Sequence, residues 1–118
     1  MPSALLIEND RDGLFVRYGG GEWISLDCTS FYLVALLLHS ERPLTGDEIH
    51  KTLVFSFLES EVTEAAIRKM VERLRNRLLF WESIIETTRI GNRVARRRRP
   101  DVTYRIFCRA SDVFPWEQ

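Results

Sequence analysis

Residues 27–40 read DCTSFYLVALLLHS, and the apolar residues 31–38 would cover nearly every side of a helix. Asp27 can cap such a helix, because its side chain can accept hydrogen bonds from the first free N–H groups. Glu41-Arg42-Pro43 follows and ends it. We therefore predict a helix over residues 28–40. Since a helix that is apolar all round is buried, it is predicted to be the central element of the core.

The 118 residues, 45% hydrophobic and 29% charged, have the composition of one compact domain. The longest apolar run is much shorter than the ~20 residues that cross a bilayer. The N-terminal sequence MPSALLIEND lacks the basic region of a secretory signal. We therefore expect a single domain over residues 1–118, located in the cytoplasm.

Few residues are arranged for catalysis or metal binding. Cys28 and Cys108 are the only cysteines, lack the spacing of a zinc site and lie in apolar surroundings typical of buried, inert thiols. The glycines at 19–21 lack the helix and lysine of a phosphate-binding loop. No nucleophile lies beside a base at a recognisable spacing. We therefore expect no enzymatic activity, no cofactor and no metal.

The net charge of zero conceals a strong asymmetry along the chain. Residues 1–60 contain four basic and nine acidic residues, whereas residues 65–109 contain thirteen basic and four acidic ones. Twelve of those thirteen are arginine, which suits bidentate contacts with phosphate and guanine. The asymmetry indicates a polyanionic partner. A solvated basic face is the alternative explanation.

The first half is predicted to contain short strands and a short capped helix. Residues 4–8, 14–18 and 22–26 are β-prone and separated by turn-rich segments, which predicts an antiparallel meander. Thr45-Gly-Asp-Glu48 has the spacing of a capping box, so a helix is expected from Thr45 to about Val54. Residues 55–60 are expected to form a loop with packed aromatic side chains.

Residues 62–80 are predicted to form a longer amphipathic helix, capped by Ser60 or Thr63. Apolar residues recur at offsets of three, four, seven and eleven, which places them on one stripe facing the core: Ile67, Met70, Val71, Leu74 and Leu78. The residues that point farthest from this stripe are Lys69, Glu72, Arg73 and Asn76, with Arg68, Arg75 and Arg77 on the shoulders. The outward face is therefore basic and polar.

The last quarter contains two more β-prone runs, residues 84–89 and 102–107. The connector over residues 90–101 carries five arginines, which predicts a hairpin with a long, charged tip. The tail beyond Arg109 contains Phe114-Pro115-Trp116, which is apolar enough to dock on this domain or on a second copy.

This order of elements over about residues 4–107 resembles the winged helix-turn-helix DNA-binding domain of bacterial OmpR/PhoB-type response regulators. The matching segments are ISLD (24–27), FYLVALL (31–37), LTGDEI (44–49), VERLRNRL (71–78), IIETTRIG (84–91) and YRI (104–106). The resemblance implies an α+β winged helix-turn-helix fold. An N-terminal antiparallel β-meander would span residues 1–27, a three-helix core 28–80, a β-hairpin wing 81–109 and a tail 110–118.

The resemblance implies a transcription regulator that binds duplex DNA, with residues 62–78 as the recognition helix in the major groove. The positions that face the bases in that family match Lys69, Glu72, Arg73 and Asn76. Arg73 suits guanine, Asn76 adenine and Glu72 the amino group of cytosine. Arg68, Arg75 and Arg77 would bind phosphates. Several wing arginines are expected to enter a narrow, A/T-rich minor groove: Arg93, Arg96, Arg97, Arg98 and Arg99.

The sequence also bears on the domain context, the oligomeric state and the alternative partners of this module. Only residues 1–3 precede the first predicted strand, so we expect a stand-alone module without a receiver domain. One module of this size reads a short site, which favours binding as a homodimer or in tandem, with Phe114 and Trp116 as candidate dimer contacts. The alternatives are a protein-interaction winged helix that contacts RNA polymerase through residues 54–61, and a module that binds duplex RNA by its shape.

Overall fold

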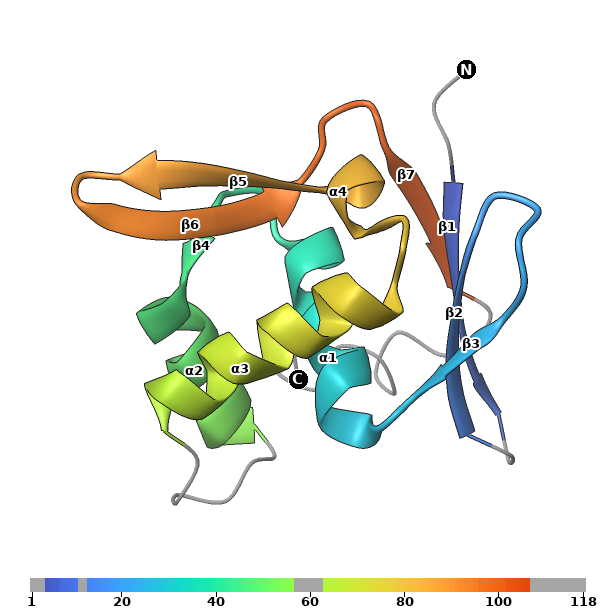
Figure 1. The fold of residues 1–118 in the computed structure, drawn as a ribbon, viewed down its shortest axis with the longest axis horizontal. Coiled ribbons are helices and arrows are strands. Elements are labelled where there is room, and N and C mark those ends of the chain that lie inside the picture. The colour runs from blue at the N-terminus through green and yellow to red at the C-terminus, as the bar shows by residue number, and fades with distance from the viewer. Residues whose placement is uncertain (1–3, 11–12, 57–62, 107–118) are drawn as a thin grey trace.

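The structure, a computed structural model, describes residues 4–10, 13–56 and 63–106. The described residues form an α+β fold with four helices and two small sheets (Figure 1). The elements in chain order are β1 (Ala4–Asp10), β2 (Gly13–Tyr18), β3 (Ile24–Leu26), α1 (Cys28–His39), β4 (Leu44–Thr45), α2 (Gly46–Ser56), α3 (Glu64–Arg77), α4 (Trp81–Ile84), β5 (Ile85–Ile90), β6 (Arg93–Arg98) and β7 (Thr103–Ile106).

The two sheets lie on different sides of the helices. The four-stranded sheet has the order β3-β2-β1-β7, and the three-stranded sheet has the order β4-β6-β5. Figure 1 shows the three-stranded sheet lying across α1, α2 and α3, with the four-stranded sheet beside α1. The predicted N-terminal antiparallel meander is confirmed, since β2 pairs antiparallel with both β1 and β3. The sequence did not predict that β7 joins this sheet, parallel to β1.

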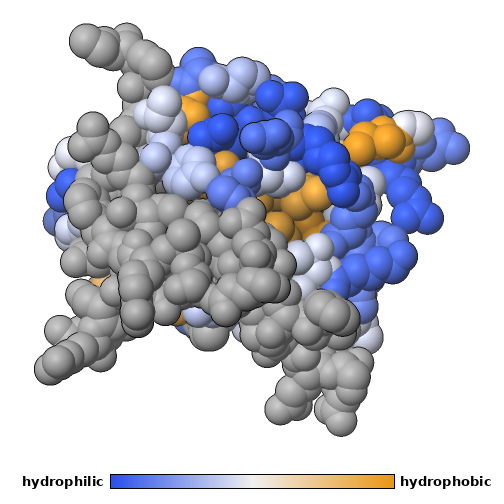
Figure 2. All heavy atoms as spheres, turned by 180° about the vertical axis from the view of Figure 1, so that it is seen from behind, coloured by the Kyte–Doolittle hydropathy of each residue, from blue (hydrophilic) through white to orange (hydrophobic). Residues whose placement is uncertain are grey.

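Helix α1 is the centre of the core, as predicted. Phe31, Leu33, Leu37 and Leu38 are buried within one apolar cluster. Apolar groups from both sheets and from α3 belong to the same cluster. On the face shown in Figure 2, the coloured surface is largely hydrophilic, with small hydrophobic patches. Asp27 caps the helix as expected, with Oδ2 accepting a hydrogen bond of 3.2 Å from the Ser30 N–H.

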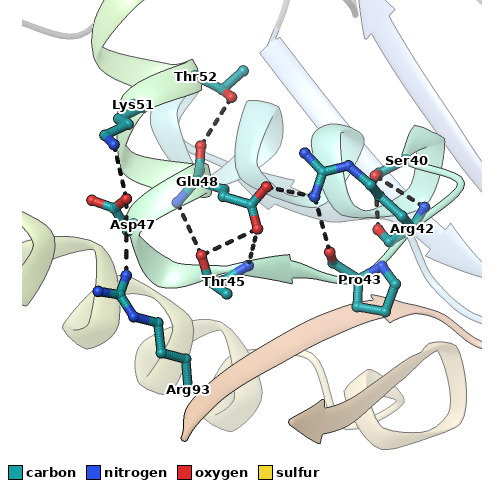
Figure 3. A network of polar contacts seen from close by, with 9 residues as sticks. All are labelled: Ser40, Arg42, Pro43, Thr45, Asp47, Glu48, Lys51, Thr52 and Arg93. Atoms are coloured by element: carbon teal, nitrogen blue, oxygen red, sulfur yellow. Dashed lines mark hydrogen bonds and ion pairs between the residues drawn. The ribbon is translucent and has the colours of Figure 1, made fainter. Parts of the chain in front are cut away.

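The predicted capping box is confirmed at the start of α2 (Figure 3). The Thr45 N–H donates to Glu48 Oε1 at 3.2 Å, and the Glu48 N–H donates to Thr45 Oγ1 at 3.3 Å. Arg42 forms an ion pair with the same Glu48 carboxylate. Helix α2 continues to Ser56, so the prediction of a loop from residue 55 was wrong for Phe55 and Ser56. The other residues of that loop lie outside the described part of the chain.

Helix α3 has the predicted inward stripe but a shorter extent than predicted. Thr63 caps it, and Ile67, Val71 and Leu74 are buried. It ends at Arg77, and α4 follows, so the prediction of three helices is corrected to four among the described residues. A continuous helix would direct Ile84 about 100° away from the stripe that begins at Ile67. The break lets Ile84 enter the core together with Trp81.

The prediction of a hairpin with a long, arginine-rich tip was wrong. Strands β5 and β6 pair closely from Ile85↔Arg98 to Ile90↔Arg93, and the turn consists of Gly91 and Asn92. Gly91 has φ +62°, a conformation that glycine adopts at the first central position of a two-residue hairpin turn. The arginine run therefore lies within β6, and residues 103–106 belong to the other sheet.

The physical reason for this correction lies in the middle of the run. Ala95 is completely buried and faces Thr88 across the ladder, and β6 also pairs with β4, so β6 is the central strand of its sheet. The high charge of residues 93–98 therefore does not prevent them from forming a strand. Residues 81–109 do not form one hairpin, since the β5–β6 hairpin spans residues 85–98.

The predictions for Cys108, Phe114 and Trp116 fall on residues 107–118, which lie outside the described residues. Cys28 begins α1, but its side chain is also outside the described part. Within the described ranges, every helix is too short or too polar to cross a membrane.

The Asp27 cap makes a testable contribution to stability. Replacing an N-cap aspartate by alanine costs about 1 kcal/mol of unfolding free energy. Denaturant unfolding of Asp27→Ala at neutral pH measures this loss.

The pKa of Asp27 gives the cap a pH dependence. Burial works to raise this pKa, but hydrogen bonds from Ser30 and the positive charge of Arg73 lower it below its ordinary value overall. A lowered pKa means that the carboxylate stabilises the fold fully above about pH 5 and loses this contribution as the pH falls through the lowered pKa.

The Asp27→Asn variant separates capping from titration. Its side-chain oxygen can still accept from the Ser30 N–H, so most of the stability at neutral pH should be retained. Its stability should then decrease less between about pH 5 and pH 3 than that of the parent protein. An equal decrease in the two proteins would show that Asp27 does not carry this part of the acid sensitivity.

Candidate nucleic-acid interface

The outer face of α3 presents the side chains that the sequence placed there. All seven predicted positions are exposed: Arg68, Lys69, Glu72, Arg73, Arg75, Asn76 and Arg77. The cause is the buried stripe on the opposite side, which fixes the rotation of the helix about its axis. With Glu64 included, α3 carries five basic and two acidic residues.

One edge of this face borders the start of α1. An open groove of about 830 Å³, which we call the α1 groove, separates α3 from the end of β3 and the first turn of α1. Arg73, Asn76 and Arg77 line it from α3, opposite Asp27 and Ser30. Arg77 Nη2 donates a hydrogen bond of 2.6 Å to the Ser25 carbonyl oxygen, which holds that guanidinium along the groove.

The other edge of α3 borders the β5–β6 hairpin. A smaller groove of about 350 Å³, the hairpin groove, is lined by Arg68 from α3 and by Arg93 and Arg96 from β6. Asp47 and Glu64 also line it. Two basic segments that are about 25 residues apart in the sequence therefore contribute to the same surface. This juxtaposition could not be read from either segment alone.

Besides Arg77, four of the predicted arginines near α4 and the end of β6 have partners within the protein. Arg75 forms an ion pair of 2.8 Å with Glu82, and Arg99 Nε donates to the Glu82 carbonyl oxygen at 2.6 Å. Arg97 pairs with its cross-strand neighbour Glu86 at 3.2 Å. The Arg98 guanidinium lies over the ring of Tyr104, 5.0 Å from its centre. The contacts of Arg98 and Arg99 tie the base of the hairpin to β7 and α4, the Arg97–Glu86 pair links its two strands, and the Arg75–Glu82 pair joins α3 to α4.

Arg96 has the least favourable surroundings of the group. Its side chain is half-buried, and its Nε is buried without a hydrogen-bond partner among the described residues. Burial lowers the pKa of Arg96, and the nearby positive charge of Arg75 lowers it further, while Glu82 and Glu72 oppose the shift. A half-buried cation near Arg75 costs stability to the extent that Glu82 and Glu72 do not offset it.

The residues next to the hairpin turn are less constrained. Arg93 Nη1 lies 4.0 Å from Asp47 Oδ2, and Lys51 Nζ contacts the same oxygen at 3.0 Å (Figure 3). Arg89 is exposed beside the turn and was not among the predicted site residues. The Gly91-Asn92 signal for a two-residue turn could have identified it.

Among the described residues, four basic side chains of α3 and the hairpin form no ion pair: Arg68, Lys69, Arg73 and Arg89.

In the part of the chain that the structure describes, no three His, Cys, Asp or Glu side chains gather in a way that could bind a metal ion. No known protein family, curated protein or solved structure matches the chain. The outer face of α3 combines exposed guanidinium groups with an amide at Asn76.

The position of Arg96 generates a prediction about stability. Arg96→Met keeps an unbranched side chain in the same space and removes a poorly solvated charge beside Arg75. We expect this variant to raise the free energy of unfolding by up to about 1 kcal/mol. Arg96→Ala should lower it by about the same amount, because the packing of the aliphatic stem is lost. Denaturant unfolding of both variants at neutral pH measures the difference. A large loss in Arg96→Met would contradict the unfavourable environment described above.

Proposed function

We propose that the protein is a transcription regulator that binds double-stranded DNA in a sequence-specific manner, as a winged helix-turn-helix module of the OmpR/PhoB type. In this proposal α3 is the recognition helix in the major groove, and the β5–β6 hairpin is the wing over the adjacent minor groove. The observation that carries the proposal is the hairpin groove, where Arg68 of α3 and Arg93 and Arg96 of β6 line one surface.

The dimensions and chemistry of α3 support this assignment. Its 14 residues form a rod about 21 Å long, and the major groove of B-DNA, about 12 Å wide, admits an α-helix. Arg73 can donate two hydrogen bonds to guanine, Asn76 suits adenine, and Glu72 can accept from the amino group of cytosine. Arg68 and Arg77 line the grooves on opposite edges of the helix, and in this proposal they would contact phosphates of the two strands that border the major groove.

The observed geometry of the hairpin changes which of its arginines could contact the minor groove. Arg89 and Arg93 flank the turn, whereas Arg97, Arg98 and Arg99 are anchored near the opposite end of the hairpin. The contact with the minor groove is therefore assigned to Arg89 and Arg93. The three anchored arginines would instead hold the wing in a fixed direction relative to α3.

A selection experiment tests the proposal. The full chain is used to enrich duplexes from a random DNA library, and the enriched duplex is compared with a scrambled duplex and with duplex RNA of the same sequence by fluorescence anisotropy. We expect a preference of at least about a thousandfold for the enriched DNA over scrambled DNA. Equal binding of RNA and DNA would favour the duplex-RNA alternative, and no binding to either at low salt would favour an acidic protein partner.

Variants of α3 provide the residue-level prediction. Arg73→Gln is expected to weaken binding to the enriched duplex by about 1–3 kcal/mol and to relax the preference at one base pair. Arg68→Gln should weaken binding to all duplexes similarly and lower the slope of log K against log salt by about 0.9.

The matched control is Arg42→Gln, since Arg42 is an exposed arginine on the turn between α1 and β4, away from both grooves along α3. Its DNA affinity and salt dependence should equal those of the parent protein. If Arg42→Gln and Arg73→Gln reduced binding equally, the effect would come from total charge and not from the face of α3.

A further inference from the structure

The end of the β5–β6 hairpin combines arginines with exposed apolar side chains. We define the hairpin tip as Arg89, Ile90, Gly91, Asn92, Arg93 and Val94, all of which are exposed. Figure 1 shows the turn projecting past α2 and α3, and Figure 2 shows a hydrophobic group among hydrophilic residues at this projecting end. Its apolar members are Ile90, which is 47% exposed, and Val94, which is 41% exposed.

The strand register distributes these residues over both faces of the tip. Ile90 lies opposite Arg93, and Arg89 lies opposite Val94. Cross-strand partners share a face of a β-ladder, so each face of the tip carries one arginine and one β-branched apolar residue. Leu79 is the third large hydrophobic residue with high exposure in the described ranges, and it lies outside the hairpin.

Single exposed apolar residues are common on protein surfaces and carry no meaning by themselves. The tip differs because Ile90 and Val94 both lie within two residues of the Gly91-Asn92 turn, and each has an arginine as its cross-strand neighbour. Neither contributes to the buried cluster that stabilises the fold. A surface complementary to this tip would combine apolar groups with negative charge on both sides.

We propose that the hairpin tip is an apolar wedge, in which Ile90 and Val94 enter the minor groove of duplex DNA and bend it. This inference rests on the proposed function. The minor groove has apolar sugar walls and a base floor between two rows of phosphates, which matches the alternation of β-branched and guanidinium groups at the tip. Apolar side chains inserted there partly unstack a base step and bend the duplex toward the major groove, where α3 would lie.

The base of the hairpin is anchored in a way that supports such an insertion. The Arg97–Glu86 ion pair, the Arg98–Tyr104 contact and the Arg99 hydrogen bond to Glu82 all lie at the end away from the turn. Pairing of β6 with β4 adds backbone hydrogen bonds on its second side. Because the hairpin is fixed at its base, binding of α3 in the major groove would hold the tip at the adjacent minor groove. A flexible loop could move away from the groove instead.

The test measures bending and binding together. A duplex of about 30 base pairs, enriched by the full chain and containing flexible TA steps beside the α3 site, carries donor and acceptor dyes at its two ends. Binding of the parent protein is expected to raise energy transfer, because a bend brings the ends closer. Binding without a change in energy transfer would overturn the wedge while leaving the proposed function intact. Failure to bind any duplex would overturn both.

The Ile90→Thr/Val94→Thr double variant removes apolar character and keeps the β-branched shape that strands favour. We expect it to lose most of the bend and about tenfold in affinity, because apolar surface is no longer buried. The slope of log K against log salt should stay unchanged, since no charge is altered. Unchanged bending and affinity in a variant that melts cooperatively like the parent would overturn the proposal.

Two companion variants complete the design. Ile90→Val/Val94→Ile exchanges the two apolar residues and should bend DNA as the parent does. Arg89→Gln/Arg93→Gln should lower the salt slope by about 2, because two phosphate contacts are lost. A fall in the salt slope for the threonine variant as well would assign its effect to phosphate contacts and overturn the apolar role of the tip.

Discussion

The complete burial of α1 is the constraint on which the rest of the structure depends. A helix that is apolar on nearly every side needs cover on nearly every side, and no single neighbour can provide it. The cover comes from both sheets, from α2 and from the inner stripe of α3. Once Ile67, Val71 and Leu74 are committed to this core, α3 cannot rotate. The basic face of α3 is therefore turned outward by the same packing that stabilises the domain.

The arginines on this surface repel one another, which lowers the stability of the fold. Acidic residues of the chain offset only part of this repulsion. Glu82 accepts contacts from both Arg75 and Arg99, and Glu86 pairs with Arg97. Arg96 has no such hydrogen-bonding partner at its buried Nε among the described residues, and it lies near Arg75. A half-buried cation of this kind is a cost in the isolated protein. Retaining it is reasonable if an anionic partner completes the cluster, which is the role that the proposed function gives to DNA.

Much of the fold could be predicted because the decisive signals are local. The Asp27 cap, the Thr45–Glu48 capping box and the period of the α3 stripe each depend on residues within a few positions of one another. The seven exposed positions of α3 followed from the same period. The errors concern long-range choices. That β7 pairs with β1 is decided by contacts about one hundred residues apart, for which the sequence offers no local pattern.

The arginine run shows why charge was a poor guide to secondary structure. Arginine has a long aliphatic stem, so it can lie along a sheet while its guanidinium finds a partner at the rim. In β6 the guanidinium groups of Arg97 and Arg98 do this through Glu86 and Tyr104, and the small Ala95 between the charged residues takes the buried position.

In the candidate site, the two ends of β6 therefore have different roles. The residues near Arg98 hold the hairpin to the body of the domain. The residues near the turn, with Arg93 only loosely held by Asp47, are available for a partner. A loop with the same composition would have spread its charges over many conformations, and binding would then have had to order all of them. The strand has already fixed their spacing and direction before any partner arrives.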